Sequence, residues 1–210
     1  MKFFLKLALA AALLSGILSR PGSAVTADAP QTVEKPTYEV TRLSEQFYRL
    51  TETKIENTNI LAFTGPDGLL LVDTGFKEHA PGLKETLAKL GLGMPKIIIN
   101  SHYHPDHIGG NALLGKESLV IAHANVRKWM ADERNVFEEF PEWAYPHVLV
   151  EDSVSLVFNG ETIRITALPA SHTDSGCLVH FITSGIAYVG AMVPGHNYPS
   201  IATTPGCEFK

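Results

Sequence analysis

The chain has 210 residues, of which 45% are hydrophobic and 19% are charged, a composition typical of one globular domain and unlike that of disordered or collagen-like proteins. Its formal net charge is −5 and its pI is near 6.0, so it has no overall attraction for a polyanion, and nucleic acid is excluded as a partner. Two cysteines, Cys177 and Cys207, are too few for a disulfide framework and too far apart for a Cys-x-x-Cys motif. A single disulfide and two free thiols both fit the sequence.

Residues 1–27 have the layout of a secretory signal peptide. Lys2 and Lys6 precede an apolar stretch, residues 7–14, and small residues follow up to Ala27. The apolar stretch is shorter than the roughly 20 residues of a membrane span, and an uncleaved signal anchor is the alternative. Cleavage removes three basic residues and no acidic ones, which leaves a net charge of −8. We therefore expect a periplasmic or secreted protein that has no stable membrane span once the signal is cleaved.

The rest of the chain predicts a linker at 28–40 and one domain at 41–210. Short apolar runs on both sides of the turn at 65–68 indicate antiparallel strands, and leucines three and four residues apart between 79 and 92 indicate a helix. We expect strands at 46–50, 59–63, 69–72, 96–100 and 119–122, a helix at 124–130, a long aromatic loop at 132–147, and strands at 154–158, 162–167, 177–182 and 187–190. This succession of strands and helices predicts a layered α/β fold.

Four side chains that can bind metal lie within six residues after the strand at 96–100. His102 and His104 are two residues apart in an extended segment, so both imidazoles can point at one ion. Asp106 and His107 follow at once, where the chain can turn into a helix and direct them at a second ion. Imidazole and carboxylate ligands favour zinc, with iron or manganese as alternatives. The competing explanations are a polar loop with unrelated histidines and a single structural ion.

The segment His102-x-His104-x-Asp106-His107 resembles the signature of the metallo-β-lactamase superfamily of metallohydrolases, and the resemblance extends over residues 47–200. It implies a four-layer αβ/βα sandwich with one or two Zn²⁺ ions per chain. It also implies a hydrolase of a small-molecule substrate, in which a metal-bound hydroxide attacks an amide, ester, lactone or β-lactam carbonyl. Asp106 is then the catalytic residue that orients the hydroxide.

Two further site residues follow from the resemblance. His172, in the segment Ser171-His172-Thr173, corresponds to the third ligand of the first ion, beside His102 and His104. Asp73, which follows the strand at 69–72, corresponds to an aspartate that supports the metal-binding loop. A turn or helix-capping role is the alternative for Asp73.

The sequence departs from the family at two places. Relatives carry an aspartate ligand at the position of Ala191, and a last histidine well beyond the position of Ser200. Both departures affect the second ion, so we expect one firmly held ion and a weak or empty second site. The second half of the sandwich is also expected to be incomplete. Either the chain is truncated, or a partner or a second copy covers the gap. The alternative function is a degenerate metal-binding remnant without catalytic activity.

Overall fold

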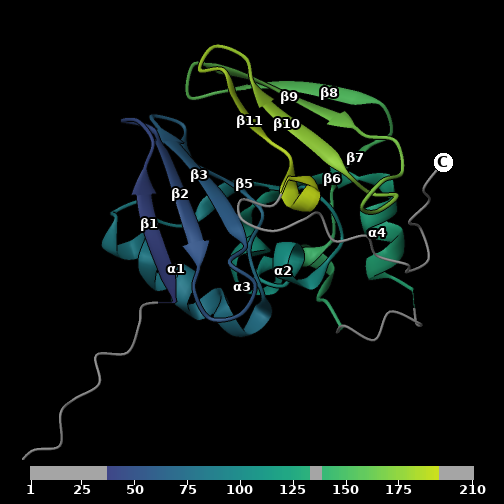
Figure 1. Cartoon of the computed structure of the whole chain (residues 1–210), viewed down its shortest axis with the longest axis horizontal. Coiled ribbons are helices and arrows are strands. Elements are labelled where there is room, and N and C mark those ends of the chain that lie inside the picture. Colours follow the sequence, from purple (N-terminus) through teal and green to yellow (C-terminus); the bar gives the residue numbers. More distant parts are fainter. Residues whose placement is uncertain (1–36, 133–138, 194–210) are drawn as a thin grey trace, which may run out of the picture. The chain divides into compact units, whose positions relative to one another are not determined.

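The computed structural model describes residues 37–132 and 139–193 (Figure 1). The predicted signal peptide, most of the predicted linker and Cys207 lie outside these ranges. Within the described ranges, no helix is long and apolar enough to cross a membrane.

A seven-stranded mixed sheet forms the first half of the fold, with its strands side by side in chain order. The first four strands form an antiparallel meander, and the fourth to seventh strands pair in parallel. The strands are β1 (Tyr38–Arg42), β2 (Phe47–Glu52), β3 (Asn59–Gly65), β4 (Gly68–Val72), β5 (Pro95–Asn100), β6 (Leu119–His123) and β7 (Val148–Val150).

Helical segments make the crossovers that parallel strands require. They are α1 (Ala80–Lys89), α2 (Pro105–Ile108), α3 (Asn111–Leu114) and α4 (Ala124–Met130), with 3₁₀ turns at Lys77–His79, Gly115–Glu117 and Glu142–Ala144. Helix α1 connects β4 to β5, α2 and α3 connect β5 to β6, and α4 follows β6.

A second, four-stranded antiparallel sheet forms the other half, in the order β11-β10-β9-β8. Its strands are β8 (Ser153–Phe158), β9 (Glu161–Ala167), β10 (Cys177–Phe181) and β11 (Ile186–Tyr188), and a 3₁₀ turn at Gly190–Met192 follows. Along β9, inward Ile163 and Ile165 alternate with outward Thr162 and Arg164, the pattern of a sheet with one buried face.

Two apolar layers hold these elements together. The layer between the sheets includes Phe63, Val72 and Ile99 from the large sheet and Phe181 from the small one. The layer on the opposite face of the large sheet is completed by Leu83 and Leu87 of α1 and by Leu90 just after the helix. Strands β3, β4 and β5 are therefore buried on both faces, which explains why they are almost continuously apolar in sequence.

The expected α/β sandwich is confirmed, with a second half smaller than the first. In the described part of the chain, no α-helix follows α4, so the second half consists of the sheet β8–β11 and one 3₁₀ turn. Strand β1 begins at Tyr38, inside the predicted linker. It has no apolar run because Tyr38 is its only buried residue. The three-residue strand β7 was too short to be predicted.

Candidate metal centre

The site lies at the carboxyl ends of β4 and β5, the edge at which open parallel sheets place their functional loops. Strand β5 ends at Asn100, and residues 101–104 lead into α2. The second half of the fold contributes the loop between β9 and β10, which contains His172. The Cys177 N–H donates to the Ser101 carbonyl at 2.7 Å and so joins this loop directly to the end of β5.

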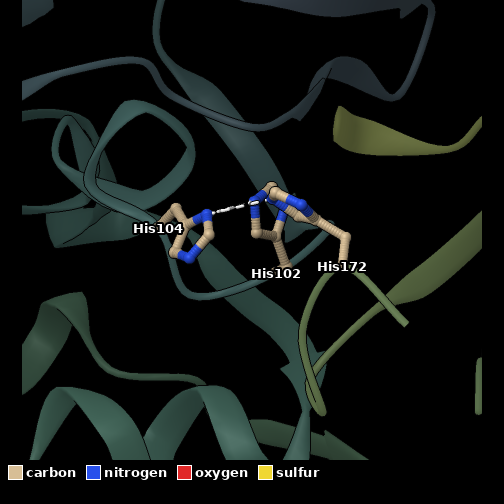
Figure 2. Close-up of side chains that lie close together, drawn as sticks. All are labelled: His102, His104 and His172. Atoms are coloured by element: carbon tan, nitrogen blue, oxygen red, sulfur yellow. Dashed lines mark hydrogen bonds between the residues drawn. The ribbon is translucent and has the colours of Figure 1, made fainter. Parts of the chain in front are cut away.

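Three imidazoles converge at this edge: those of His102, His104 and His172 (Figure 2). The Nδ1 atom of His104 lies 3.2 Å from Nε2 of His102 and 3.1 Å from Nε2 of His172. One ligand atom from each residue falls within 4.8 Å of the other two. Two nitrogens bound to a tetrahedral zinc at its usual bond length are ~3.3 Å apart. The two separations from the His104 nitrogen therefore match those of ligands that share one tetrahedral ion.

The electrostatics of the cluster suit a metal ion. Burial, followed by the neighbouring His172, lowers the pKa of His104 to about 4. Burial also holds the pKa of His102 well below its ordinary value, with the other imidazoles adding to the effect. Both rings are therefore neutral at pH 7 and keep the lone pairs that a metal requires.

Asp106 and His107 lie beside this cluster as a separate pair. The His107 ring centroid is 4.0 Å from that of His102, and its Nε2 is 2.9 Å from Oδ2 of Asp106. Burial opposes a charge on either group. The two carboxylates that flank His107 outweigh burial and raise its pKa to about 10, while His107 holds the pKa of Asp106 well below its usual range. Among the described residues, no third His, Cys, Asp or Glu completes a metal-binding group with this pair.

Asp73 connects the metal-binding loop to both halves of the fold. It is fully buried, and its backbone has a φ of 67°, a left-handed conformation that aspartate tolerates better than most residues. Its Oδ1 accepts the Ser101 N–H at 2.7 Å, and its Oδ2 accepts the Ser101 hydroxyl at 2.7 Å. Oδ2 also lies 2.6 Å from Nδ1 of His107 and accepts the Tyr188 hydroxyl at 2.8 Å. Asp73 thus fixes the start of the loop and the ring of His107.

Two residues that the sequence analysis did not identify hold the pair in place. The Thr58 hydroxyl donates to Oδ2 of Asp106 at 2.8 Å. Tyr188 on β11 donates to Asp73 and to the Asn59 carbonyl. Thr58 lies in a polar loop and Tyr188 in a short strand, and a hydroxyl in either setting does not identify its partner.

The loop before Thr58 depends on Glu52, whose carboxylate is buried at the end of β2. Its oxygens accept the N–H groups of Lys54, Ile55 and Glu56. Burial opposes ionisation of this carboxyl, but the three donors and His79 outweigh it and lower the pKa of Glu52. Glu52 therefore holds the turn that carries Thr58 to Asp106.

Replacing Glu52 with glutamine is expected to destabilise the fold by about 1–3 kcal/mol at pH 7, since a buried charge-assisted acceptor is lost. Because the pKa of Glu52 in the folded protein lies below its ordinary value of 4.5, its contribution to stability is present above that value and is lost as the pH falls through the folded pKa. Urea unfolding at pH 7 and pH 4 measures both effects. Glu56→Gln, an exposed neighbour in the same turn, is the control, and equal losses in the two variants contradict this role.

Ala191 lies on the wall of a shallow pocket next to the histidine cluster. The pocket is lined by Ser101, His102, Ser171, His172, Thr173, Gly176, Val189, Ala191 and Met192. Gly190 has a φ of 57°, and a Cβ there would lie 2.6 Å from the Ser101 hydroxyl, so the chain passes very close to the metal-binding loop. Ala191 thus lines the same pocket as His102 and His172, but its side chain brings no metal-binding atom.

Two other described histidines have structural roles. His123 accepts the Asn125 N–H and caps α4, and His147 accepts the Val120 N–H.

A buried amide pair, Asn100 and Asn111, was also not identified from the sequence. The Asn111 amide donates to Oδ1 of Asn100 at 2.8 Å, and the Asn100 amide donates to the His107 carbonyl, which braces α2 and α3.

A family model described as the metallo-beta-lactamase superfamily matches residues 54–203, more than half of the chain. The chain belongs to the metallo-β-lactamase superfamily. Its three converging imidazoles are therefore placed in a fold whose members are metallohydrolases.

Solved structures of superfamily members have the same fold. A metallo-β-lactamase from Pontibacter korlensis matches with a TM-score of 0.67 and 20% identity over 81% of this chain and 79% of that one. A subclass B3 enzyme of Bradyrhizobium japonicum matches with a TM-score of 0.59 and 24% identity over 70% and 59%. A Cronobacter sakazakii enzyme with a HARLDQ motif matches with a TM-score of 0.59 and 23% identity over 70% and 60%. The chain thus spans about 60% of the length of the last two enzymes.

Proposed function

We propose that this protein is an exported, zinc-dependent hydrolase of the metallo-β-lactamase superfamily that cleaves an amide, ester, lactone or β-lactam. The observation that carries the proposal is the convergence of three imidazole nitrogens, those of His102, His104 and His172, within 4.8 Å. Three imidazole ligands leave one tetrahedral position open, as catalytic zinc sites do. Export rests on the signal-peptide layout of residues 1–27.

The chain's own residues divide the work around this centre. Zinc, when bound, supplies a Lewis acid that activates water at neutral pH and stabilises charge on a carbonyl oxygen. Asp106 is ionised at neutral pH and is held by Thr58 and His107, so its carboxylate is placed to orient water by a hydrogen bond. Its low pKa makes it a weak base, so a proton that it accepts passes readily to the leaving group.

The loops around the site determine which substrates bind there, and two other considerations narrow the substrate class. The structural neighbours above are described as metallo-β-lactamases, which supports testing β-lactams first. An exported protein meets β-lactams and other extracellular esters and amides more readily than the thioesters of cytosolic metabolism. We therefore propose that the substrate is a small β-lactam, lactone or related ester.

A hydrolysis panel tests the proposal. The zinc-loaded protein is assayed on a chromogenic β-lactam, a lactone and a thioester, with and without a chelator. Chelator-sensitive turnover of at least one substrate is expected. A protein that binds zinc but turns over no member of the panel supports the alternative, a metal-binding remnant, which is favoured by Ala191 on the pocket wall.

We further propose that one ion is held firmly and that a second is held weakly, because the pair Asp106 and His107 has no third donor among the described residues. Metal analysis after dialysis is expected to give one equivalent of zinc per chain. In Ala191→Asp, which adds a carboxylate beside the cluster, a second equivalent should be retained. Two equivalents in the unaltered protein contradict this proposal.

A further inference from the structure

Helix α4 lies against both loops that supply the three histidines. Its residue Trp129 stacks on the ring of Tyr103, with centroids 5.4 Å apart and an interplanar angle of 26°. Tyr103 stands between His102 and His104 in the sequence, and it is only 5% exposed. The face of the Trp129 indole therefore supports the loop that carries the first two imidazoles.

The edge of the same indole binds the other loop. Nε1–H of Trp129 donates to Oδ1 of Asp174 at 2.7 Å, and Asp174 is two residues after His172. The Asn125 side chain, also on α4, donates to the Asp174 carbonyl at 2.8 Å. A short bond from a neutral donor to a carboxylate is stronger than a bond between two neutral groups. Trp129 thus contacts both loops with one rigid side chain.

Besides the histidine contacts, the direct bonds between the loops lie on the C-terminal side of His172 and include the bond from the Cys177 N–H to the Ser101 carbonyl at 2.7 Å. The Tyr103 N–H donates to the Ser175 hydroxyl at 3.3 Å, and that hydroxyl lies 3.1 Å from the hydroxyl of Thr173. These contacts act on the backbone next to His172, whereas Trp129 spans the gap from α4 to both loops. A metal site needs its ligands held within about 0.5 Å of the productive geometry. Because the ligands come from loops 68 positions apart, a side chain that touches both loops can set their separation.

We propose that Trp129 is a positioning residue for the metal centre, which it serves by fixing the His172 loop to the His102–His104 loop through Asp174 and Tyr103. The inference rests on the proposed zinc site. It assigns to helix α4 a role in metal affinity that does not require any contact between α4 and the ion.

The test is zinc affinity, measured by competition with a chromogenic chelator on metal-free protein. Trp129→Phe keeps an aromatic face for Tyr103 but removes the N–H, and we expect zinc affinity to fall about ten-fold, as it does when groups that orient metal ligands are lost. Trp143→Phe is the matched control, because Trp143 also donates one indole N–H bond, to the Ala112 carbonyl on α3 at 3.1 Å, and neither residue belongs to the loops that carry His102, His104 and His172. Trp143→Phe is expected to leave zinc affinity unchanged.

Substitutions at Asp174 separate positioning from a general effect on folding. Asp174→Ala removes the acceptor and should weaken zinc binding as much as Trp129→Phe, whereas Asp174→Asn keeps an oxygen acceptor and should restore affinity to within about three-fold of the unaltered protein. The double variant Trp129→Phe/Asp174→Ala should be no weaker than either single variant. The d–d absorption of a bound cobalt ion should change in Trp129→Phe and not in Trp143→Phe.

Equal zinc affinity in Trp129→Phe and Trp143→Phe, or fully additive losses in the double variant, would overturn the inference. Failure of the unaltered protein to bind zinc is a different result, and it would refute the proposed metal centre itself. Thermal unfolding of the metal-free variants provides the check on folding. A loss of zinc affinity that Asp174→Asn does not restore contradicts the role of the hydrogen bond.

Discussion

Replacing His172 with alanine is expected to weaken zinc binding by more than about 100-fold, beyond the effect of losing an outer partner of a ligand. The reason is geometric: His172 is the only one of the three converging imidazoles that comes from the second half of the fold, so its loss leaves two donors on one loop. Two imidazoles bind zinc far less firmly than three. Competition with a chromogenic chelator measures the loss, and hydrolysis of any substrate found in the panel should disappear with it.

The matched control is His180→Ala. His180 lies on β10 of the same sheet, pairs with Arg164 and Ala187 across the strands, and is partly exposed. The variant His180→Ala also loses an imidazole from the second half of the fold but leaves the cluster intact, so its zinc affinity should be unchanged. Zinc affinity in His172→Ala that matches the value in His180→Ala contradicts the assignment of His172 as a ligand.

The sequence predicted the parts of this protein that are determined locally. Strands β3, β4 and β5 are buried on both faces, so they appear as continuous apolar runs, and α1 shows its buried face as Leu83 and Leu87. The two-residue spacing of His102 and His104 is also local, because an extended segment points alternate side chains the same way. Such features need only a few neighbouring residues to be recognised.

Contacts made by distant residues could not be predicted in this way. Thr58 binds Asp106 across 48 positions, and Tyr188 binds Asp73 across 115 positions. Each contact depends on which strands the topology brings together at the site, and no periodicity in one segment encodes that. Placing His172 required resemblance to a family, since a lone histidine after a strand indicates nothing by itself.

The edges of the fold were also poorly predicted, for a related reason. Strand β1 has one buried residue and four exposed ones, so most of its side chains resemble those of a linker. It becomes a strand because β2 offers it a ladder of hydrogen bonds from Tyr38 to Arg42. The aromatic residues of the loop at 132–147 fit either a site border or a satellite hydrophobic cluster, and Phe140 and Tyr145 pack on a cluster with Ile108 and Met130.

Replacing Asp73 with alanine is expected to cost about 3–5 kcal/mol of stability, the range observed when one partner of a buried charged pair is removed. The substitution removes the carboxylate acceptor of the Ser101 N–H, of Nδ1 of His107 and of the Tyr188 hydroxyl. It also places alanine at a backbone φ of 67°, a left-handed conformation that is less favourable for alanine than for aspartate. Urea unfolding of metal-free protein measures the change.

Two comparisons show whether the carboxylate itself is responsible. Asp73→Asn tolerates the same backbone conformation and keeps one oxygen, so it should lose less stability than Asp73→Ala, and the difference reports the charge that faces His107. Asp152→Ala, which removes an exposed aspartate before β8, should change the free energy of unfolding by less than about 0.5 kcal/mol. Because Asp73 joins the end of β4 to the metal-binding loop and to β11, its loss should also lower zinc affinity in whatever protein remains folded. Asp73→Ala protein as stable as Asp152→Ala would mean that the hydrogen bonds to Asp73 do not hold the two halves of the site together.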